Sequence, residues 1–479
     1  MNTTLKTILV SVSDKTGLLD LLAKIQQYHQ DLNIIATDST ADYLNSNGYN
    51  CTLVSDLTGF PAILDGRVKT LHPHVFGGLL ARPTDAHLNT LKEYHIPAID
   101  LAIVNLYPFS EKRQLDLPFE KLIEFIDIGG VSLIRAAAKN HERVTILSSP
   151  SDYEQLQQRL DTSNGSLLPG DRQYFAMRAF QHTAQYDALI AQSFVEKEST
   201  QTDAFPETIS IPLVQEQAMR YGENPQDAAS WYRYSADNQA GLFDCLQGKA
   251  LSYNNLLDTH AACELLKDLT LAFPKQAACC IIKHANPCGV ALDSSIDKAY
   301  QRAFNADPIS AFGGIIALNQ TVTGPLAEAI CNQFAEIVIA PQFDADAKVK
   351  LASKKNLRLL ELDVRTLVEP QQHYRDLGPF GMLVSQTSNA DNLQLDVVTK
   401  ETLPNNLEEQ AQFAWIIAKH LRSNAIAVVK DFVTLGLGIG QTSRIASTQI
   451  ALTQAGAQAK GAILASDGFF PAEDNIEAA

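Results

Sequence analysis

The sequence predicts an α/β protein with at least two domains, the first of which contains a parallel sheet. Short apolar segments of strand length alternate with amphipathic segments of helix length through the first third of the chain. This alternation is typical of βα units, whose strands lie parallel. The chain has 479 residues, about three times the usual domain length, and 46% of them are apolar, which suffices for more than one core.

The strands and helices of the first domain are expected in a regular order. Residues 8–13 form the first predicted strand, and residues 18–28 form a helix that Ser13 or Asp14 caps. Further strands are predicted at residues 32–37, 101–105 and 144–148. Ligands of parallel sheets bind beyond the carboxyl ends of the strands, so the polar residues that follow these segments are candidate binding residues.

A polar segment separates this region from the rest of the chain. Residues 196–203 read Glu-Lys-Glu-Ser-Thr-Gln-Thr-Asp and include no apolar side chain. We therefore expect an N-terminal domain at residues 1–195, a linker at 196–212 and a C-terminal domain at 213–479.

The second domain contains two similar strand segments. Cys-Cys-Ile-Ile-Lys at residues 279–283 and Ile-Ala-Val-Val-Lys at residues 426–430 both combine small and β-branched side chains and end in lysine. A glycine-containing strand segment follows each, at residues 312–318 and 435–440. The similarity predicts two related α/β halves. Their expected bounds are residues 213–369 and 380–479.

The charge balance narrows the range of possible partners. The 38 Lys and Arg residues against 54 Asp and Glu residues give a net charge of −16, which argues against a nucleic-acid partner because phosphate neutralisation needs clustered positive charge. Small phosphorylated ligands need only a few local cations and backbone amides, so they remain compatible. No apolar run of about 18 residues occurs, so no membrane span is expected.

The cysteines favour a reducing, cytoplasmic location. The chain has seven of them, an odd number, and no Cys-x-x-Cys pair. Neither a disulfide framework nor a structural zinc site is therefore expected. The N-terminal apolar segment is also too short for the core of a signal peptide.

Lys283 and His284 end the first of the two similar strand segments, and Pro287 and Gly289 terminate it at once. A histidine at a strand end is suited to accept a proton from a substrate. The alternative for an isolated pair is a surface lysine and a capping histidine. The segment lacks both the Glu of His-x-Glu and the second Cys of Pro-Cys-x-x-Cys, so the zinc chemistry of deaminases is not expected.

Other segments of the second domain carry groups that bind anions. Arg220 and Tyr221 precede a turn, and the planar guanidinium suits a phosphate or a carboxylate. Residues 251–255 and 307–314 add amides, hydroxyls and exposed backbone, although each alone is as consistent with turn chemistry as with a site. The glycines of residues 436–441 do not have the spacing of a dinucleotide-binding loop.

The first domain has three candidate anion-binding segments. Residues 66–73 form a basic cluster, and residues 14–17 open a helix whose first amides attract an anion. Residues 127–130 begin another helix that contains Lys139, which either projects into a site or coats the helix surface. Lys15 lacks the upstream glycine of a P-loop, so nucleoside-triphosphate chemistry is not expected. The residues alone thus predict two domains that each bind a small anionic ligand.

Together these motifs resemble the bifunctional purine-biosynthesis enzymes that combine aminoimidazole carboxamide ribonucleotide (AICAR) formyltransferase with inosine monophosphate (IMP) cyclohydrolase. The resemblance covers nearly the whole chain. Segments 11–17, 67–73, 105–109 and 127–130 match the cyclohydrolase part, and segments 220–225, 283–289, 307–314 and 440–444 match the formyltransferase part. It implies a methylglyoxal-synthase-like parallel-sheet domain followed by a duplicated cytidine-deaminase-like α/β domain.

The resemblance implies that Lys283 and His284 deprotonate the amine of AICAR as it attacks the formyl group of 10-formyltetrahydrofolate, the formyl-donating cosubstrate. It implies no catalytic metal. Because the formyltransferase sites of the family form between subunits, a homodimer is expected. The residues implied in binding the nucleotide or the folate are Arg220, Tyr221, Asn254, Gly313, Glu336, Asn424, Arg444, Ile445, Phe469 and Asp474.

In the first domain the resemblance implies closure of formyl-AICAR to IMP with loss of water. The residues implied in this step are Lys69, Tyr107, Asp127 and Lys139. The residues implied in lining the nucleotide site are Ser13, Asp14, Lys15, Thr37, Thr40, Arg67, Thr70, Asn105 and Gly129.

The sequence departs from the family pattern at several positions. Asp38 and Ser39 replace a Gly-Gly pair, and a carboxylate there repels a phosphate that glycine amides would approach. Phe76 and Gln226 replace histidines. The sequence ends at Ala479, where family members continue with a segment that completes the formyltransferase site, so impaired formyl transfer is expected.

Two alternatives to a bifunctional enzyme remain open at this point. One is an enzyme that retains only one of the two activities. The other is a non-catalytic purine-nucleotide-binding protein. The intact pairs Lys283–His284 and Lys69–Lys139 favour an enzyme, whereas Asp38 favours a binding protein.

Overall fold

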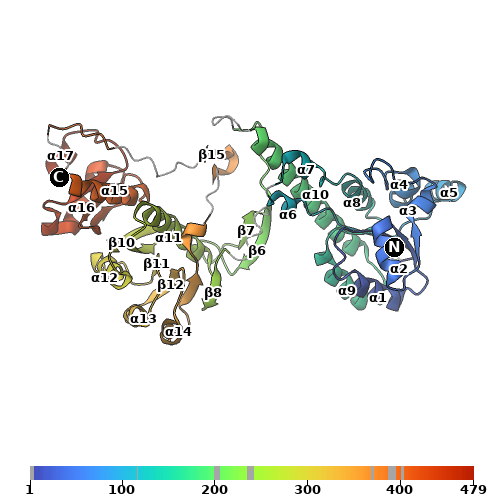
Figure 1. Ribbon diagram of the computed structural model, residues 1–479, viewed down its shortest axis with the longest axis horizontal. Coiled ribbons are helices and arrows are strands. Elements are labelled where there is room, and N and C mark those ends of the chain that lie inside the picture. The colour runs from blue at the N-terminus through green and yellow to red at the C-terminus, as the bar shows by residue number, and fades with distance from the viewer. Residues whose placement is uncertain are drawn as a thin grey trace. The chain divides into compact units, whose positions relative to one another are not determined.

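The computed structural model describes residues 5–115, 117–198, 205–234, 242–367, 372–386, 395–400 and 404–479. The chain divides into two compact units, Met1–Val214 with Tyr232–Asn238, and Gln215–Trp231 with Gln239–Ala479 (Figure 1). Residues 199–204 of the predicted linker lie outside the described residues.

The first unit contains a five-stranded sheet in the order β3-β2-β1-β4-β5, with every neighbouring pair parallel. Its strands are β1 Thr7–Ser11, β2 Asn33–Ala36, β3 Cys51–Leu53, β4 Leu101–Val104 and β5 Thr145–Leu147. Its helices are α1 Leu18–Tyr28, α2 Asp38–Ser46, α3 Val54–Thr58, α4 Pro73–Leu80, α5 Asp85–Glu93, α6 Phe109–Arg113, α7 Phe119–Ile123, α8 Gly129–Lys139, α9 Tyr153–Thr162 and α10 Pro169–Glu198.

Both faces of this sheet are buried, because helices cover each side. Ile8 and Val10 of β1 pack into one core cluster with residues of α1 and α9, whereas Leu9 between them packs into the other with residues of α8 and α10. Strands buried on both faces have continuous apolar sequences. This is why the sequence predicts β1, β2, β4 and β5 to within two residues at each end.

One predicted feature of this unit is wrong. The N-cap of α1 is Gly17, with φ of 70°, and not Ser13 or Asp14. No side chain caps the helix there. The left-handed backbone that glycine permits takes the chain into α1 instead.

The second unit contains a nine-stranded sheet in the order β18-β16-β17-β10-β9-β11-β12-β13-β8. Its strands are β8 Asp244–Gln247, β9 Ala277–Lys283, β10 Asn286–Asp293, β11 Gly314–Leu318, β12 Ala335–Ala340, β13 Arg358–Glu361, β16 Ile426–Lys430, β17 Val433–Gly438 and β18 Ile463–Ser466. Two further ribbons are separate sheets of two strands each. One consists of β14 Gln372–Asp376 and β15 Met382–Gln386 in the second unit, and the other of β6 Leu213–Met219 and β7 Ala229–Tyr234, whose residues are divided between the two units.

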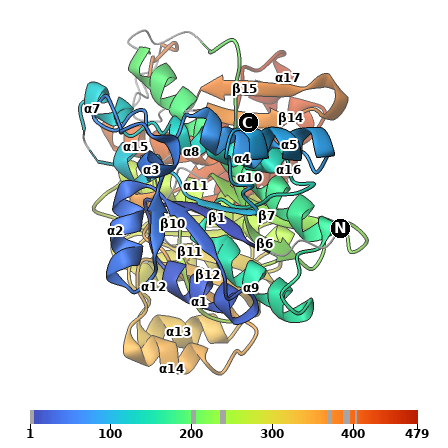
Figure 2. The same ribbon diagram turned by 90° about the vertical axis from the view of Figure 1, so that its right-hand side faces the viewer.

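Helices cover both faces of the nine-stranded sheet. They are α11 Tyr253–Ala272, α12 Ile296–Ala306, α13 Gly324–Cys331, α14 Ala345–Leu351, α15 Asn405–Lys419, α16 Arg444–Ala455 and α17 Asp474–Ala478. Cys280 and Ile282 of β9 share a core with α11 and α15, whereas Cys279 and Ile281 share a core with α12 and α13. Helices α13 and α14 lie side by side (Figures 1 and 2).

The second unit repeats one arrangement, as the sequence predicts. The order α11-β9-β10-α12-β11 recurs as α15-β16-β17-α16-β18. Both strand hairpins turn through two residues with positive φ, His284 and Ala285 in the first and Asp431 and Phe432 in the second. Two central residues with positive φ are characteristic of a type I′ turn. The α/β fold with a parallel first sheet and a duplicated second domain is therefore confirmed.

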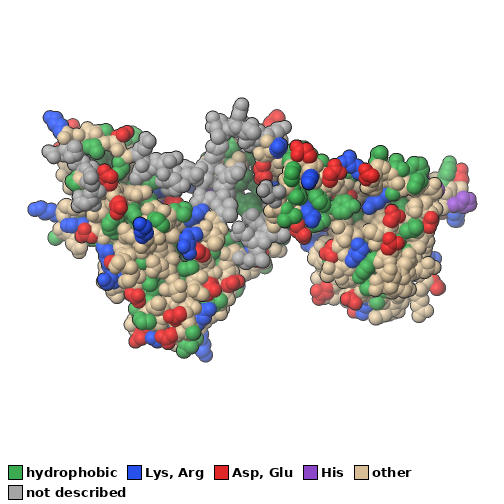
Figure 3. Space-filling view, in the orientation of Figure 1, with side chains coloured by type: hydrophobic (Ala, Val, Ile, Leu, Met, Phe, Trp, Pro, Cys, Tyr) green, Lys and Arg blue, Asp and Glu red, His purple; other side chains and the backbone are tan. Residues whose placement is uncertain are grey.

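The outer surface mixes both signs of charge. On the face shown in Figure 3, Lys and Arg side chains are interspersed with Asp and Glu. Among the described residues, no helix has the length and apolar composition needed to cross a membrane. Over the same residues, no cluster of three or more His, Cys, Asp or Glu side chains could hold a metal ion.

Glycines let the helices approach the two central strands closely. A Cβ at Gly289 of β10 would lie 2.0 Å from the Ala303 carbonyl oxygen of α12, and one at Gly436 of β17 would lie 1.9 Å from the Ala451 carbonyl oxygen of α16. These are equivalent positions of the repeat, each three residues after the start of its strand.

We expect Gly289→Ala to destabilise the second unit by about 3 kcal/mol, because the helix backbone must shift to admit a methyl group. Thermal unfolding measures the loss. Gly170→Ala is the control, since nothing lies within 4 Å of a Cβ built at Gly170. Equal melting temperatures of Gly289→Ala and the wild type would contradict the prediction.

Candidate active sites

The first candidate site lies at the carboxyl ends of β1, β2 and β4. Asn105, the residue after β4, accepts hydrogen bonds from the Ser13 amide at 2.6 Å and the Asp14 amide at 3.0 Å. Its own amide donates to the Asp14 carbonyl at 2.7 Å. The side chain of Asn105 therefore fixes the loop between β1 and α1, in which Ser13 and Asp14 are exposed.

The other side of this loop is held by α2. Thr40 is fully buried, and its hydroxyl accepts from the Val12 amide at 3.3 Å. The Thr37 hydroxyl donates to Ser11 Oγ at 3.4 Å and to Thr40 Oγ1 at 3.3 Å. Thr37 and Thr40 thus position the loop, whereas Asp38 is exposed in the first turn of α2.

Asp14 and Lys15 occupy the exposed part of the loop. The amide and hydroxyl of Thr16 hydrogen bond to Asp14 and hold the pKa of its carboxyl below the ordinary value, with a smaller contribution from Lys15. The Lys15 ammonium lies 5.9 Å from the centre of the Tyr43 ring on α2.

A second group gathers at the start of α8; we call its members Lys69, Thr70, Tyr107, Asp127 and Gly129 the α8 site. Burial raises the pKa of the Asp127 carboxyl, although the Gly130 amide, the Lys69 charge and the Tyr107 amide each lower it. The Gly130 amide donates to Asp127 Oδ1 at 2.6 Å. These contacts bring Asp127, Lys69 and Tyr107 together.

Thr70 completes the α8 site with an unused polar atom. Its side chain is 1% exposed, and its hydroxyl has no hydrogen-bond partner. A Cβ at Gly129 would lie 2.7 Å from that hydroxyl, which places Thr70 against the first residue of α8. An unpaired hydroxyl beside the amides of a helix N-terminus suits an anionic or carbonyl oxygen of a ligand.

One predicted residue of this unit lies apart from the α8 site. Lys139 is the last residue of α8 and is exposed, about 15 Å along the helix axis from Gly129. The structure therefore does not bring Lys139 to Asp127. Arg67 is exposed and forms an ion pair with Glu124.

Sequence reasoning missed Tyr186 of α10. Its hydroxyl accepts from the Asp127 amide at 2.8 Å and donates to the Phe125 carbonyl at 3.0 Å, and burial raises its pKa to about 12. Tyr186 thus holds the segment that leads into the α8 site. A tyrosine in a long amphipathic helix carries no sequence signal for this role.

The second candidate site lies along one edge of the nine-stranded sheet, which we call the sheet edge. Ile282 pairs with Ile315, and Gly314 pairs with Ala335. These registers place the end of β9 with Lys283 next to the start of β11 with Gly313, and next to the start of β12 with Glu336.

Residues of the second half reach the same edge. Ala291 of β10 pairs with Val433 of β17 in antiparallel fashion, so that the end of β17 runs toward the start of β10. Ile426 pairs with Gly438 on one side and with Ser466 on the other. Asn424 before β16, Arg444 after β17 and Asp467 after β18 therefore belong to the sheet edge.

His284 stands exposed on the first hairpin turn. The Asp258 carboxylate of α11 accepts from the Ala285 amide at 2.7 Å. Asn254 lies one helical turn before Asp258 and thus on the same face of α11, which brings it toward this turn. A capping box between Ser252 and Asn255 fixes the start of that helix.

Lys283 and Asn286 flank the turn. The Lys283 ammonium donates to the Phe312 carbonyl at 2.7 Å, next to Gly313, which has φ of 73°. The Asn286 amide donates to the His284 carbonyl at 2.8 Å, while Asn286 Oδ1 is buried and has no partner. The edge thus presents an imidazole together with an unused acceptor.

Glu336 is already engaged in an ion pair. Arg358 Nη1 lies 2.9 Å from Glu336 Oε2, and the guanidinium also donates to the Lys249 and Ala250 carbonyls. Arg358 is 4% exposed. Sequence reasoning did not single out this arginine.

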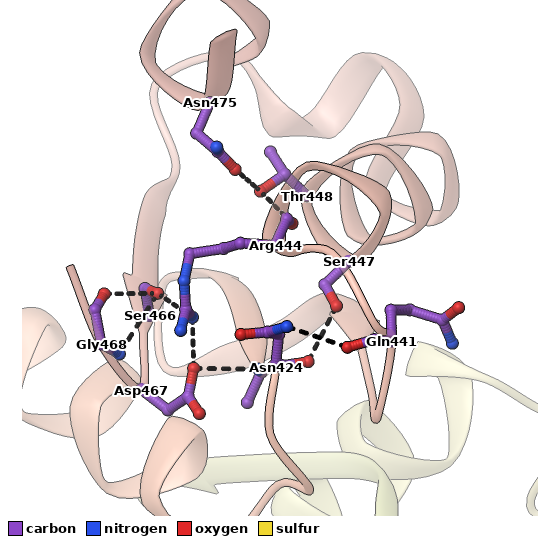
Figure 4. Close-up of polar contacts among 10 residues, drawn as sticks. Asn424, Gln441, Arg444, Ser447, Thr448, Ser466, Asp467, Gly468 and Asn475 are labelled. Carbon is purple, nitrogen blue, oxygen red and sulfur yellow. Dashed lines mark hydrogen bonds and ion pairs between the residues drawn. The ribbon is translucent and has the colours of Figure 1, made fainter. Parts of the chain in front are cut away.

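Figure 4 shows the polar network around Asn424 and Arg444. The Asn424 amide donates to the Gln441 carbonyl at 2.9 Å, and Ser447 donates to the Asn424 carbonyl at 2.8 Å. Arg444 donates to Ser466 Oγ at 2.7 Å and forms an ion pair with Asp467. Burial raises the pKa of Asp467, but hydrogen bonds from Arg444 and Ser423 outweigh it and hold that pKa below the ordinary value.

Within the described ranges, the contacts of the remaining predicted residues do not connect them to His284. Arg220 stacks on Tyr221, 5.5 Å from the ring centre, in the loop after β6, and no contact among the described residues links either one to His284. Ile445 is half-buried in the first turn of α16. Phe469 is 85% exposed, and Asp474 is exposed and accepts a hydrogen bond from Asn475.

Two family models match this chain and together cover most of its length. The family model of the AICARFT/IMPCHase bienzyme matches residues 137–454, and that of the MGS-like domain matches residues 17–132. A solved chain titled "Crystal structure of ForH" is 36% identical, with a TM-score of 0.36, and the match covers 40% of this chain and 99% of that one.

Curated relatives match along nearly the whole chain. "Bifunctional purine biosynthesis protein PurH" of Thermoanaerobacter sp. (strain X514) is 44% identical over 99% of this chain and 92% of its own length. The proteins of the same name from Polynucleobacter necessarius and Bacillus cereus (strain B4264) are 43% and 41% identical with the same coverage. The chain belongs to the AICARFT/IMPCHase bienzyme family, the bifunctional enzymes of the last two steps of IMP biosynthesis.

Proposed function

We propose that this chain transfers a formyl group to AICAR at the sheet edge and closes formyl-AICAR to IMP at the α8 site. The proposal of both reactions rests on membership of the bienzyme family. The assignment to sites is supported by the gathering of Lys283, His284 and Asn424 at one edge of the second sheet, and of Lys69 and Asp127 at the start of α8.

In formyl transfer, His284 is the proton acceptor. The amine of AICAR attacks the formyl carbon and loses a proton to His284. The bond from that carbon to the donor nitrogen then breaks, and the nitrogen keeps the electron pair, takes the proton back from His284 and leaves as tetrahydrofolate. When bound, 10-formyltetrahydrofolate supplies the formyl group. The unused Asn286 Oδ1 at the same edge is suited to a donor group of the nucleotide or the folate.

In ring closure, the carboxamide nitrogen of formyl-AICAR attacks the formyl carbon and water leaves. Asp127 is placed to move a proton in this step, because its half-buried carboxyl has a raised pKa and Lys69 lies near it. The amides that begin α1 and α2 are suited to hold the phosphate. Lys139 has no part in this scheme.

The oligomeric state and location complete the proposal. Ile309, Phe312 and Phe469 belong to segments beside the sheet edge and are 88%, 60% and 85% exposed. Large exposed apolar side chains mark surfaces that bind partners, and a second copy of the chain is the partner we propose. The proposed location is the cytoplasm.

The alternative with only one activity, or with nucleotide binding alone, is tested at His284. His284→Ala should lower formyl transfer by about 10²- to 10⁴-fold, because the proton acceptor is lost. AICAR binding and closure of supplied formyl-AICAR should persist. His260→Ala, an exposed histidine of α11, is the control. Unchanged formyl transfer in His284→Ala would remove the catalytic assignment of this edge.

Asp127→Asn should abolish ring closure and stabilise the first unit at pH 7. Burial raises the folded-state pKa of Asp127 above its unfolded value, so stability is lost as pH rises through the folded pKa. A neutral amide avoids that loss, and the gain should vanish toward pH 3, where the carboxyl is protonated in both states. Melting temperatures across pH measure this. The exposed variant Asp31→Asn should show no such gain.

Asp38→Asn should lower the KM for formyl-AICAR about threefold, because it removes a negative charge from the helix N-terminus that we assign to the phosphate. Steady-state kinetics of ring closure provide the measurement. Asp42→Asn, one turn further along α2, is the matched control. If the two variants behave alike, the phosphate lies elsewhere.

A further inference from the structure

The turn that carries His284 is held by a charged side chain from a neighbouring helix. Asp258 of α11 accepts from the Ala285 amide at 2.7 Å. Burial raises the pKa of its carboxyl above the ordinary value, although the Ala285 amide, the His284 charge and the His284 amide each lower it. Asp258 is thus a half-buried carboxyl group at the turn that carries His284. No family motif that the sequence displays includes it.

The repeat within the second unit offers an internal comparison. In the second hairpin the first turn residue, equivalent to His284, is Asp431, and its amide donates to Gln410 Oε1 of α15 at 2.7 Å. In the first hairpin the amide that donates to the helix side chain belongs to the second turn residue, Ala285. A helix side chain therefore holds the turn in both halves. In the second half that side chain is a neutral amide, which shows that holding such a turn requires an acceptor and not a negative charge.

The lysine that precedes each turn behaves alike in both halves. Lys283 donates to the Phe312 carbonyl at 2.7 Å, and Lys430 donates to the Lys460 carbonyl at 3.0 Å. The two hairpins therefore share their backbone turn and their lysine contact. They differ in the turn residue, histidine or aspartate, and in its support, carboxylate or amide.

We propose that Asp258 is a positioning residue for formyl transfer, whose negative charge stabilises the imidazolium that forms when His284 accepts the proton of the AICAR amine. This rests on the proposed role of His284. The carboxylate fixes the left-handed turn through the Ala285 amide and opposes the positive charge as it develops. Both halves share a helix side chain that accepts a hydrogen bond from an amide of the turn, and only the His284 turn has a negative charge at that helix position.

The other charged side chains described around the turn are engaged elsewhere, so Asp258 is the one that can oppose the charge of the imidazolium. Lys283, on the strand itself, is drawn to the Phe312 carbonyl. Asp307 follows α12 and accepts from the Ser310 hydroxyl at 2.6 Å. Burial raises the pKa of the Cys288 thiol, and the Asp307 charge raises it further. Arg444, on the side of the second half, is paired with Asp467. Asp258 is the acid whose carboxylate contacts the turn.

The test compares Asp258→Asn, Asp258→Ala and Gln410→Glu in the full chain. Asp258→Asn keeps an acceptor oxygen and removes the charge, so it should lower kcat of formyl transfer about tenfold while the KM for AICAR stays within twofold. Gln410→Glu, which puts the charge into the equivalent place of the second half, should leave kcat unchanged. Asp258→Ala should lower both kcat and the melting temperature.

A second measurement does not depend on turnover. Diethyl pyrocarbonate modifies neutral imidazole, and peptide mass spectrometry follows its reaction at the exposed His284. If the Asp258 charge stabilises the imidazolium, its loss should raise the modification rate in Asp258→Asn above that of the wild type. The rate in Gln410→Glu should equal that of the wild type.

The outcomes separate the two proposals. If His284→Ala abolishes formyl transfer but Asp258→Asn matches the wild type in kcat and in modification rate, the charge of Asp258 has no role and the inference fails alone. If His284→Ala keeps full formyl transfer, the proposed site fails. If the wild type shows no formyl transfer, the modification rates at His284 test the inference by themselves. Equal rates in Asp258→Asn and in the wild type would then overturn it.

Discussion

The pairing of β10 with β17 is the contact on which the second unit depends. The Leu292 amide donates to the Phe432 carbonyl at 2.9 Å, and the Val290 amide donates to the buried Thr434 hydroxyl at 3.0 Å. Because the strands are antiparallel, the end of β17 runs toward the start of β10. One short contact thus joins two repeated halves into a single sheet and assembles one edge from both of them.

In the first unit, side chains hold the loop at the predicted binding site in place. Its sheet is parallel, so successive strands end at one edge and only the loops need to be fixed. Asn105 fixes the loop after β1 from one side and Thr40 fixes it from the other. Asn105 and Thr40 are thus buried residues that support the loop. The exposed residues Ser13 and Asp14 of the same loop remain available to contact a ligand.

Much of the fold could be predicted because its strands are buried on both faces and therefore have continuous apolar sequences. Strand β3, with Thr52 exposed among only three residues, lacks that signal. Candidate site residues could be singled out where they belong to motifs at the end of a strand, as Lys283 does, or just before a helix, as Asp127 does. Asp258 and Tyr186 act by binding backbone amides from distant helices, and such contacts appear only once the chain is folded. Lys139 shows the converse, since nearness in sequence to a motif did not place it at the α8 site.

The ion pairs Glu336–Arg358 and Arg444–Asp467 have a consequence for ligand selection. Glu336 and Arg444 are already paired before any ligand arrives. A ligand that draws Arg444 away from Asp467 exchanges one ion pair for another, so the number of ion pairs stays constant. An inorganic anion therefore gains little at Arg444, whereas a ligand with many contacts distributes the exchange over all of them. At these two positions the sheet edge selects its ligand by shape and hydrogen bonding more than by charge.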